Sequence, residues 1–213
     1  MIYLELDKNQ RDFVRKHQSH PFKFFLDKPE EFDRLYSWSS FCDAGMAHYW
    51  APKAKKVIDI GCGQGGVAAI MNILWGCEIW LIDGIGGGNR ESQYGPEKEM
   101  KYYSTWTDLP DTFQKWGCRM DLVHFVSIDE AKNYNWPTVD LIMSFRSCGF
   151  HYPMNTYEWL YKKINTEDTR YYMTIGGLKA PLEIPPEFEI IGKNVPMGAP
   201  TRNGSYYFLK RTL

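Results

Sequence analysis

The chain has 213 residues, of which 44% are hydrophobic and 24% charged, values close to those of an average globular protein. This length and composition predict one folded domain with a sizeable core and argue against intrinsic disorder. The 25 lysines and arginines nearly balance the 26 aspartates and glutamates, so no overall positive charge exists to attract nucleic acid or an anionic membrane.

Cysteine and histidine usage argues against a disulfide framework and against a metal site. The five cysteines are odd in number, stand far apart and form no CxxC pair. Four of the five histidines, at positions 17, 20, 48 and 124, show no ligand spacing, and His124 is expected in the core. No apolar run approaches the ~20 residues that span a bilayer, and no signal peptide is evident. We therefore expect a cytoplasmic protein with no membrane partner and no metal.

The first half of the chain predicts a helical N-terminal region followed by a strand, a helix and a second strand. Residues 1–55 mix charged stretches with aromatic residues, which predicts two or three short helices packed on the main body. Residues 56–60, KVIDI, are short, apolar and β-branched, so they predict a buried strand. Residues 65–75 have helical spacing up to Gly76, and EIWLID at 78–83 predicts the second strand.

The second half continues the alternation of strands and helices. Residues 84–103 have no apolar period and are rich in glycine and charge, so we expect a long loop. The remaining expected elements are helices near 109–117, 129–135 and 154–164, strands at 121–126, 140–145 and 170–176, and an antiparallel pair at 187–195 and 204–211. This alternation predicts a doubly wound, mostly parallel α/β sheet with helices on both faces.

The glycine-rich turn GCGQGG, residues 61–66, lies between the first strand and the first helix of this sheet. Glycine there costs folding entropy, so we expect a ligand to approach the backbone closely. Gly61, Gly63 and Gly66 match the GxGxxG spacing of dinucleotide-binding enzymes. Asp59, however, would place a negative charge beside a pyrophosphate. A cationic ligand fits the turn better.

Asp59, Gly61, Gly63 and Gly65 reproduce the pattern acid-x-Gly-x-Gly-x-Gly. The turn thereby resembles motif I of the class I S-adenosylmethionine-dependent methyltransferases. The resemblance implies S-adenosyl-L-methionine as cofactor and a Rossmann-like methyltransferase fold, whose seven-stranded sheet ends in an antiparallel hairpin. It also implies a single domain over 1–213, in which 1–55 form a helical extension or lid and 56–213 form the cofactor-binding catalytic core.

The resemblance implies a set of cofactor-binding residues at the ends of successive strands. Asp83 is expected to accept hydrogen bonds from both ribose hydroxyls, although nicotinamide enzymes place an acid there too. Ser127 or Asp129 is expected to bind the adenine amino group, or else to start the helix at 129–135, and both can be true. The full expected set is Asp59, Gly61, Cys62, Gly63, Gly65, Asp83, Ser127, Asp129 and Ser144.

The segment SFRSCGFHYP, residues 144–153, resembles the Ser-x-x-Ser-x-Gly-x-His-Tyr-Pro run of a group of proteins assigned as sugar O-methyltransferases. This resemblance implies methyl transfer to a hydroxyl of a small molecule, with a sugar as the candidate. His151 is the expected general base, because imidazole can take a hydroxyl proton near neutral pH; otherwise it is a structural loop histidine. Arg146 either binds an anionic group of the acceptor or pairs with a surface acid.

Aromatic residues are the expected contacts of the acceptor, since flat rings favour sugar faces, bases or cations. Tyr152 and Trp38 are the candidates, the latter from an N-terminal group that forms either a lid or part of the core. That group contains Tyr36, Trp38, Phe41, Tyr49 and Trp50.

Two other functions stay open. One is a nucleic-acid methyltransferase that uses a basic strip of Arg11, Arg15, Lys16 and Lys23, which the near-zero net charge disfavours. The other is a non-catalytic module that binds S-adenosylmethionine. Nothing in the sequence predicts the oligomeric state.

Overall fold

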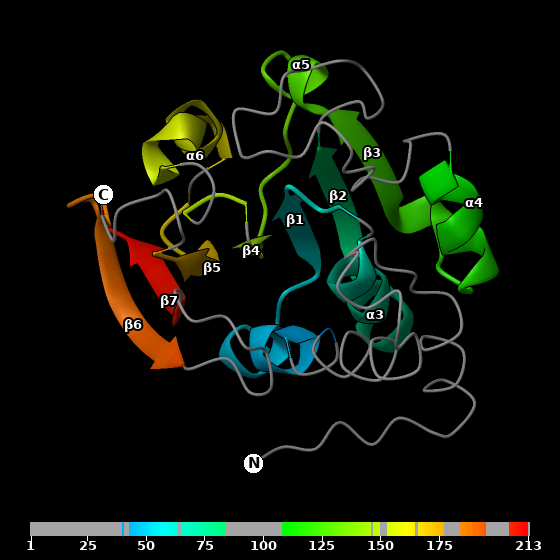
Figure 1. The fold of residues 1–213 in the computed structure, drawn as a ribbon, viewed down its shortest axis with the longest axis horizontal. Helices are drawn as coiled ribbons and strands as arrows, with labels where there is room; N and C mark the ends of the chain where they lie inside the picture. The colour runs from blue at the N-terminus through cyan, green and yellow to red at the C-terminus, as the bar shows by residue number, and fades with distance from the viewer. Residues whose placement is uncertain are drawn as a thin grey trace, which may run out of the picture.

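Seven strands form one mixed sheet in the order β3-β2-β1-β4-β5-β7-β6 (Figure 1). The computed structural model describes residues 40, 43–63, 65–83, 108–145, 147–149, 153–164, 166–176, 184–194 and 205–212. The strands are β1 Lys56–Ile60, β2 Glu78–Asp83, β3 Val123–Ser127, β4 Leu141–Ser144, β5 Arg170–Ile175, β6 Phe188–Asn194 and β7 Ser205–Arg211. The first five pair in parallel, whereas β7 runs antiparallel to both β5 and β6. The predicted sheet and its antiparallel C-terminal hairpin are confirmed.

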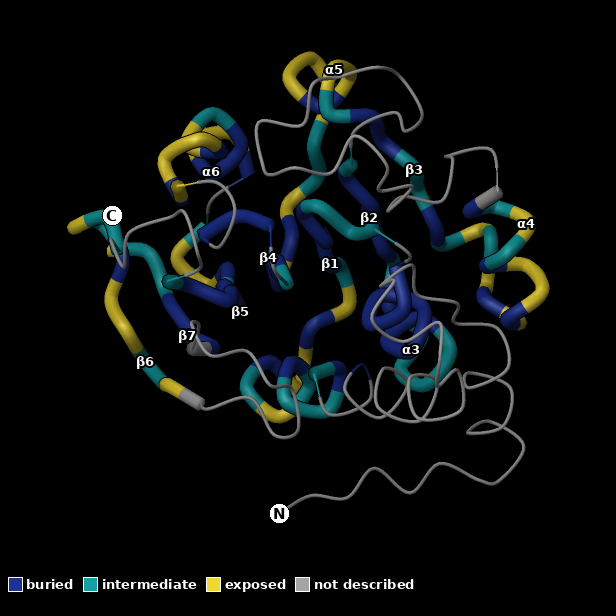
Figure 2. The backbone as a smooth tube through the Cα atoms, viewed as in Figure 1, coloured by how far each residue is buried: buried dark blue, intermediate teal, exposed yellow. Residues whose placement is uncertain are grey.

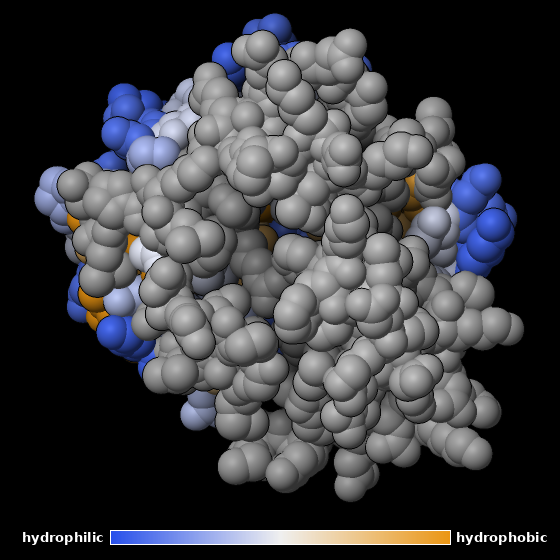
Figure 3. Space-filling view, viewed as in Figure 1, coloured by the Kyte–Doolittle hydropathy of each residue, from blue (hydrophilic) through white to orange (hydrophobic). Residues whose placement is uncertain are grey.

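Helices cover both faces of the sheet. The helices are α3 Gly66–Trp75, α4 Asp108–Lys115, α5 Ile128–Ala131 and α6 Glu158–Ile164, with 3-10 turns η2 Met120–Leu122 and η3 Met154–Tyr157. One hydrophobic cluster packs α3 and α4 on one face, and a second packs α6 on the other. Most residues of the central strands are buried, while α4, α5 and α6 also carry exposed residues (Figure 2). Hydrophilic side chains cover these three helices on the surface (Figure 3).

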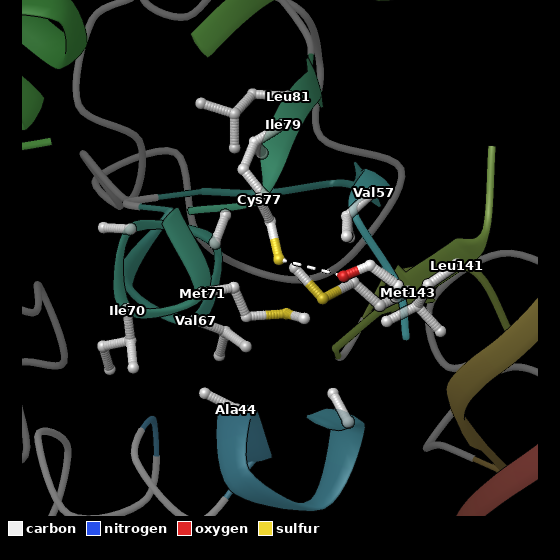
Figure 4. Close-up of a cluster of buried hydrophobic side chains, with 14 of the residues drawn as sticks. Ala44, Val57, Val67, Ile70, Met71, Cys77, Ile79, Leu81, Leu141 and Met143 are labelled. Carbon is white, nitrogen blue, oxygen red and sulfur yellow. Dashed lines mark hydrogen bonds between the residues drawn. The ribbon is translucent and has the colours of Figure 1, made fainter. Parts of the chain in front are cut away.

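Strand alternation decides on which face each β1 side chain lies. Val57 belongs to the cluster with α3, whereas Ile58 and Ile60 belong to the opposite cluster. Because side chains alternate along a strand, Asp59 lies on the α3 face, among apolar residues. Figure 4 shows this cluster, in which side chains of β1, β2 and β4 meet those of α3.

Residues 43–50 form a helix that packs between α3 and the β6–β7 hairpin (Figure 1). His48 stacks on Trp75 of α3 with ring centroids 4.2 Å apart, and Trp50 stacks on Phe208 of β7 at 4.8 Å. Trp50 therefore packs against the core. This agrees with the second of the two roles predicted for the N-terminal aromatic group, which were a lid and a part of the core. Tyr49 is exposed, and Tyr36, Trp38 and Phe41 lie outside the described residues.

The helix predicted at 129–135 is shorter in the structure, because α5 ends at Ala131. The indole N–H of Trp136 donates to the Ala131 carbonyl oxygen at 2.9 Å, so it takes an acceptor that a longer helix would use itself. The helix at 154–164 is confirmed as α6, preceded by the turn η3. The loop at 84–103 lies outside the described residues.

The sequence suggested that His124 lies in the core, but the structure shows a partly exposed residue. About a third of its side chain is exposed, its Nε2 lies 2.9 Å from Glu78 Oε1, and its ring stacks on Trp80. Among the described residues, no helix is long and apolar enough to cross a membrane.

Candidate functional site

The glycine turn lies at the carboxyl edge of the sheet, between the end of β1 and the start of α3. The amides of Gly61 and Cys62 both donate to the Ile82 carbonyl oxygen of β2, at 2.7 and 3.3 Å. Gly61, Gly63 and Gly65 have φ angles of 67°, 54° and 67°, a region that residues with side chains rarely adopt. The backbone conformation alone therefore favours glycine at these three positions.

The space beside the three glycines differs. A Cβ on Gly61 would stand 2.1 Å from Ser147 Oγ, and one on Gly65 would stand 2.6 Å from the Phe113 ring. A Cβ on Gly63 would meet no atom of the described residues within 4 Å. Protein packing thus explains why Gly61 and Gly65 carry no side chain, whereas no described residue covers the backbone at Gly63.

Asp83 supports this turn from the end of β2. Its Oδ2 accepts a hydrogen bond from the Gly63 amide at 2.7 Å. The Cys62 thiol lies 4.0 Å from the same oxygen. Burial, with smaller effects of Asp83 and Asp59, raises the pKa of Cys62 well above its usual value, so the thiol stays neutral and is no nucleophile.

Asp59 is a buried acid directly below the turn. Its residue is 3% exposed, and no described residue forms a hydrogen bond or an ion pair with its carboxyl group. Burial, and secondly the charge of Asp83, raises the pKa of Asp59 to about 8. Two carboxyl groups therefore stand together at a turn with open backbone, an arrangement that a bound cation would stabilise.

Ser127 and Asp129 lie at the end of β3, where their roles separate. The Ser127 hydroxyl accepts from the Glu130 amide, and the Ser127 amide donates to Glu130 Oε2 at 3.2 Å, which completes a capping box for α5. Asp129 is exposed and lines an open hollow of about 610 Å³ together with Phe125, Val126, Glu130, Asn133 and Tyr134. Ser127 thus starts α5, as one of the two alternatives predicts, and Asp129 is the exposed side chain of the two.

Ser144 is fully buried and its hydroxyl is engaged within the protein. Its Oγ donates to the Ile60 carbonyl oxygen at 2.8 Å and accepts from the Cys148 amide at 2.9 Å. The Cys148 thiol in turn lies 3.0 Å from the Tyr161 hydroxyl of α6. Ser144 therefore fastens the segment after β4 to the end of β1, beside the turn.

The sequence did not reveal that Ser147 packs against Gly61 or that Phe113 packs against Gly65. The spacing of Ser144 and Ser147 in the segment after β4 was the one relevant sequence pattern, and it does not indicate which residue Ser147 contacts. The predicted acceptor-side residues Trp38, Arg146, His151 and Tyr152 lie outside the described residues.

Comparison with solved structures finds many similar folds. A mutant of MtNAS in complex with S-adenosylmethionine has a TM-score of 0.59 at 11% identity, over 96% of this chain and 72% of that one. The N,N-8-amino-8-demethyl-D-riboflavin dimethyltransferase RosA from Streptomyces davawensis has a TM-score of 0.55 at 10% identity, over 95% and 68%. An RNA methyltransferase from Salinibacter ruber in complex with S-adenosyl-L-homocysteine has a TM-score of 0.50 at 10% identity, over 79% and 90%.

The chain has the Rossmann-like methyltransferase fold. No family model and no curated protein sequence matches it. At such low sequence identities the structural similarity shows the fold alone.

We predict that Gly61→Ala destabilises the protein more than Gly63→Ala does. Both variants carry a side chain at positive φ, which costs about 1–2 kcal/mol. Only Gly61→Ala also collides with Ser147, which adds about 1–3 kcal/mol. Urea unfolding measures both free energies. Ser147→Gly should rescue Gly61→Ala, and equal losses for the two alanine variants would contradict this assignment of the open position.

We predict that the stability advantage of Asp59→Asn over the wild type grows with pH. An unfolded aspartate ionises near pH ~3.9, whereas folded Asp59 keeps its proton up to about pH 8. The wild type should therefore lose stability between these two values and lose no more above them, while the asparagine variant lacks this loss. The free energy of unfolding measured across this pH range tests the slope. The exposed Asp168→Asn serves as control, and a constant difference between Asp59→Asn and wild type would refute the buried acid.

Proposed function

We propose that this chain is an S-adenosylmethionine-dependent methyltransferase. The observation that carries the proposal is the open backbone at Gly63 between the two acids Asp59 and Asp83. S-adenosylmethionine carries a sulfonium and an ammonium, and both positive charges suit this acidic site. When bound, it supplies an electrophilic methyl group that an acceptor atom attacks in line with the sulfur.

Each cofactor-side residue then has a separate task. Asp83 holds the turn through Gly63 and is proposed to accept hydrogen bonds from the ribose as well. Asp129 stands beside the open hollow at the end of β3 and is proposed to contact the adenine ring there. Asp59 loses its proton when a positive charge binds, because that charge offsets the cost of a buried carboxylate. Cys62 contributes as part of the turn, without thiol chemistry.

The proposed acceptor is a hydroxyl of a small molecule, with a sugar as the candidate. Support comes from the segment after β4, which Ser144 and Cys148 fasten at the carboxyl edge of the sheet, next to the turn. His151 follows this segment and is proposed as the general base, with Arg146 to bind an anionic group of the acceptor. Tyr152 and Trp38 are proposed to contact the acceptor.

The dinucleotide-binding alternative is less well supported. Asp59 would place an acid without a described partner next to a pyrophosphate, and that ligand would push its pKa higher still. The antiparallel β7 between β5 and β6 also belongs to the methyltransferase arrangement of the sheet.

We predict that Asp83→Asn raises the dissociation constant of S-adenosylmethionine by about tenfold or more. The amide oxygen still accepts from Gly63 N–H, but the charge that binds the ribose is lost, and hydrogen bonds to charged groups are worth about 1.5–3 kcal/mol. Isothermal titration calorimetry measures the affinity, with exposed Asp121→Asn as control. Unchanged affinity, or tight binding of a nicotinamide dinucleotide to the wild type, would count against the proposal.

We predict that His151→Ala lowers the turnover number by about 100-fold and leaves the affinity for S-adenosylmethionine almost unchanged, because only proton transfer is lost. The assay follows radiolabelled methyl groups from S-adenosylmethionine into fractions of a cell extract. His124→Ala, a partly exposed histidine paired with Glu78, is the matched control. Near-normal turnover of His151→Ala would remove His151 from the chemistry.

The same assay separates the remaining functions. A nucleic-acid methyltransferase would give a radiolabelled product that ribonuclease degrades. Its binding to that acceptor would also fall steeply with salt. Binding of S-adenosylmethionine without transfer to any fraction would indicate a non-catalytic module.

A further inference from the structure

The segment after β4 is fixed on two sides at the carboxyl edge of the sheet. On the side of β1, Ser144 Oγ donates to the last carbonyl oxygen of that strand at 2.8 Å. On the side of β5, the Gly176 amide donates to the Gly149 carbonyl oxygen at 3.1 Å. Ser147 lies between these anchors and contacts Gly61 so closely that a Cβ there would stand 2.1 Å from Ser147 Oγ. The Ser147 hydroxyl is therefore held in place beside the glycine turn.

The Ser147 hydroxyl has no partner among the described residues and still reaches the surface. None of them donates to it or accepts from it, whereas the Ser144 hydroxyl forms two hydrogen bonds. Ser147 is 9% exposed. The described side-chain atoms that are both sealed from solvent and without a partner belong to Trp50, Trp80, Trp116 and Thr174. Because Ser147 is not one of these residues, its hydroxyl is accessible from outside.

Ser147 and Asp83 approach the turn from opposite sides. In the sheet, β1 lies between β2, which ends at Asp83, and β4, which leads to Ser147. The Gly61 amide donates to the Ile82 carbonyl oxygen of β2, while the open side of the Gly61 α-carbon contacts Ser147. Two strand spacings, about 10 Å, separate β2 from β4. A ribose bound to Asp83 does not span that distance, so Ser147 faces another part of the ligand.

That part is the amino-acid end of S-adenosylmethionine. The methionine portion is attached to the 5′ carbon of the ribose and extends away from it, with an ammonium and a carboxylate at its far end. Asp59 and Asp83 attract the ammonium and repel the carboxylate. The carboxylate needs a hydrogen-bond donor, and a serine hydroxyl can supply one.

Backbone donors of the turn are already in use. Amides that donate within the protein are those of Gly61, Cys62, Gly63 and Gly65. The Ser147 hydroxyl therefore offers what these amides do not, a donor free for a ligand on the β4 side of the turn.

We propose that the Ser147 hydroxyl binds the carboxylate of S-adenosylmethionine and so selects ligands with an intact amino-acid end. Ser147 Oγ donates to a carboxylate oxygen on the β4 side of Gly61. The bound amino-acid end then bridges the glycine turn and the segment after β4, which carry the proposed cofactor and acceptor residues. This inference rests on the proposed methyltransferase function and adds a specificity-determining residue on the cofactor side.

The test compares Ser147→Ala with the wild type by isothermal titration calorimetry. The two ligands are S-adenosylmethionine and its decarboxylated form, which keeps the sulfonium and the ammonium. Loss of one hydrogen bond to a charged group should raise the dissociation constant of S-adenosylmethionine about tenfold. The dissociation constant of the decarboxylated form should change less than twofold.

Thermal unfolding supplies the control for a structural role. Ser147→Ala should keep the melting temperature of the wild type, because it removes no hydrogen bond between described residues. Ser144→Ala is the matched variant in the same segment. It should lower the melting temperature, because it removes two buried hydrogen bonds.

The outcomes separate this inference from the function on which it rests. Unchanged affinity of Ser147→Ala for S-adenosylmethionine would overturn the inference and leave the methyltransferase proposal intact. Equal weakening of both ligands would overturn it too, since Ser147 would then bind the ammonium or only support the turn. A melting temperature as low as that of Ser144→Ala would mark Ser147 as structural. No binding of either ligand by the wild type would remove both proposals.

Discussion

The hydrogen bond from the Gly63 amide to Asp83 Oδ2, at 2.7 Å, is the contact on which the candidate site depends. It joins the turn after β1 to the end of β2 and so sets the backbone opening beside the proposed ribose ligand. The parallel pairing of β1 with β2 brings both partners to the same edge of the sheet. A carboxylate can accept several hydrogen bonds at once, so the same side chain can shape the turn and bind a ligand.

The acid pair at this turn shows a balance between stability and binding. A buried carboxyl at Asp59 without a described partner is costly for the empty protein, and the nearby charge of Asp83 increases that cost. A cationic ligand would reverse the effect, because it favours the ionised form. Binding sites often retain such locally unfavourable groups when a ligand uses them.

The two sides of the site are mechanically linked. Ser147, from the segment after β4, fills the space beside Gly61, and Ser144 fastens that segment to the carbonyl of Ile60. The segment that carries the proposed acceptor residues therefore packs directly on the turn that carries the proposed cofactor residues. A change in either one should be transmitted to the other, because close-packed side chains leave no room for independent movement.

The sequence by itself determined the elements whose cause is local. Apolar runs at 56–60 and 78–83, the alternation of strands with helices and the glycine turn with its acid were sufficient to predict the sheet and its C-terminal hairpin. The tertiary structure decided what depends on residues distant in the chain. Only the fold shows that Ser147 packs against Gly61, that no described residue covers Gly63, and that the Trp136 indole bonds to the last residue of α5. The pairing of Asp83 with Ser127 likewise exists only in the sheet, because pairing between strands, and not spacing along the chain, sets which side chains stand together.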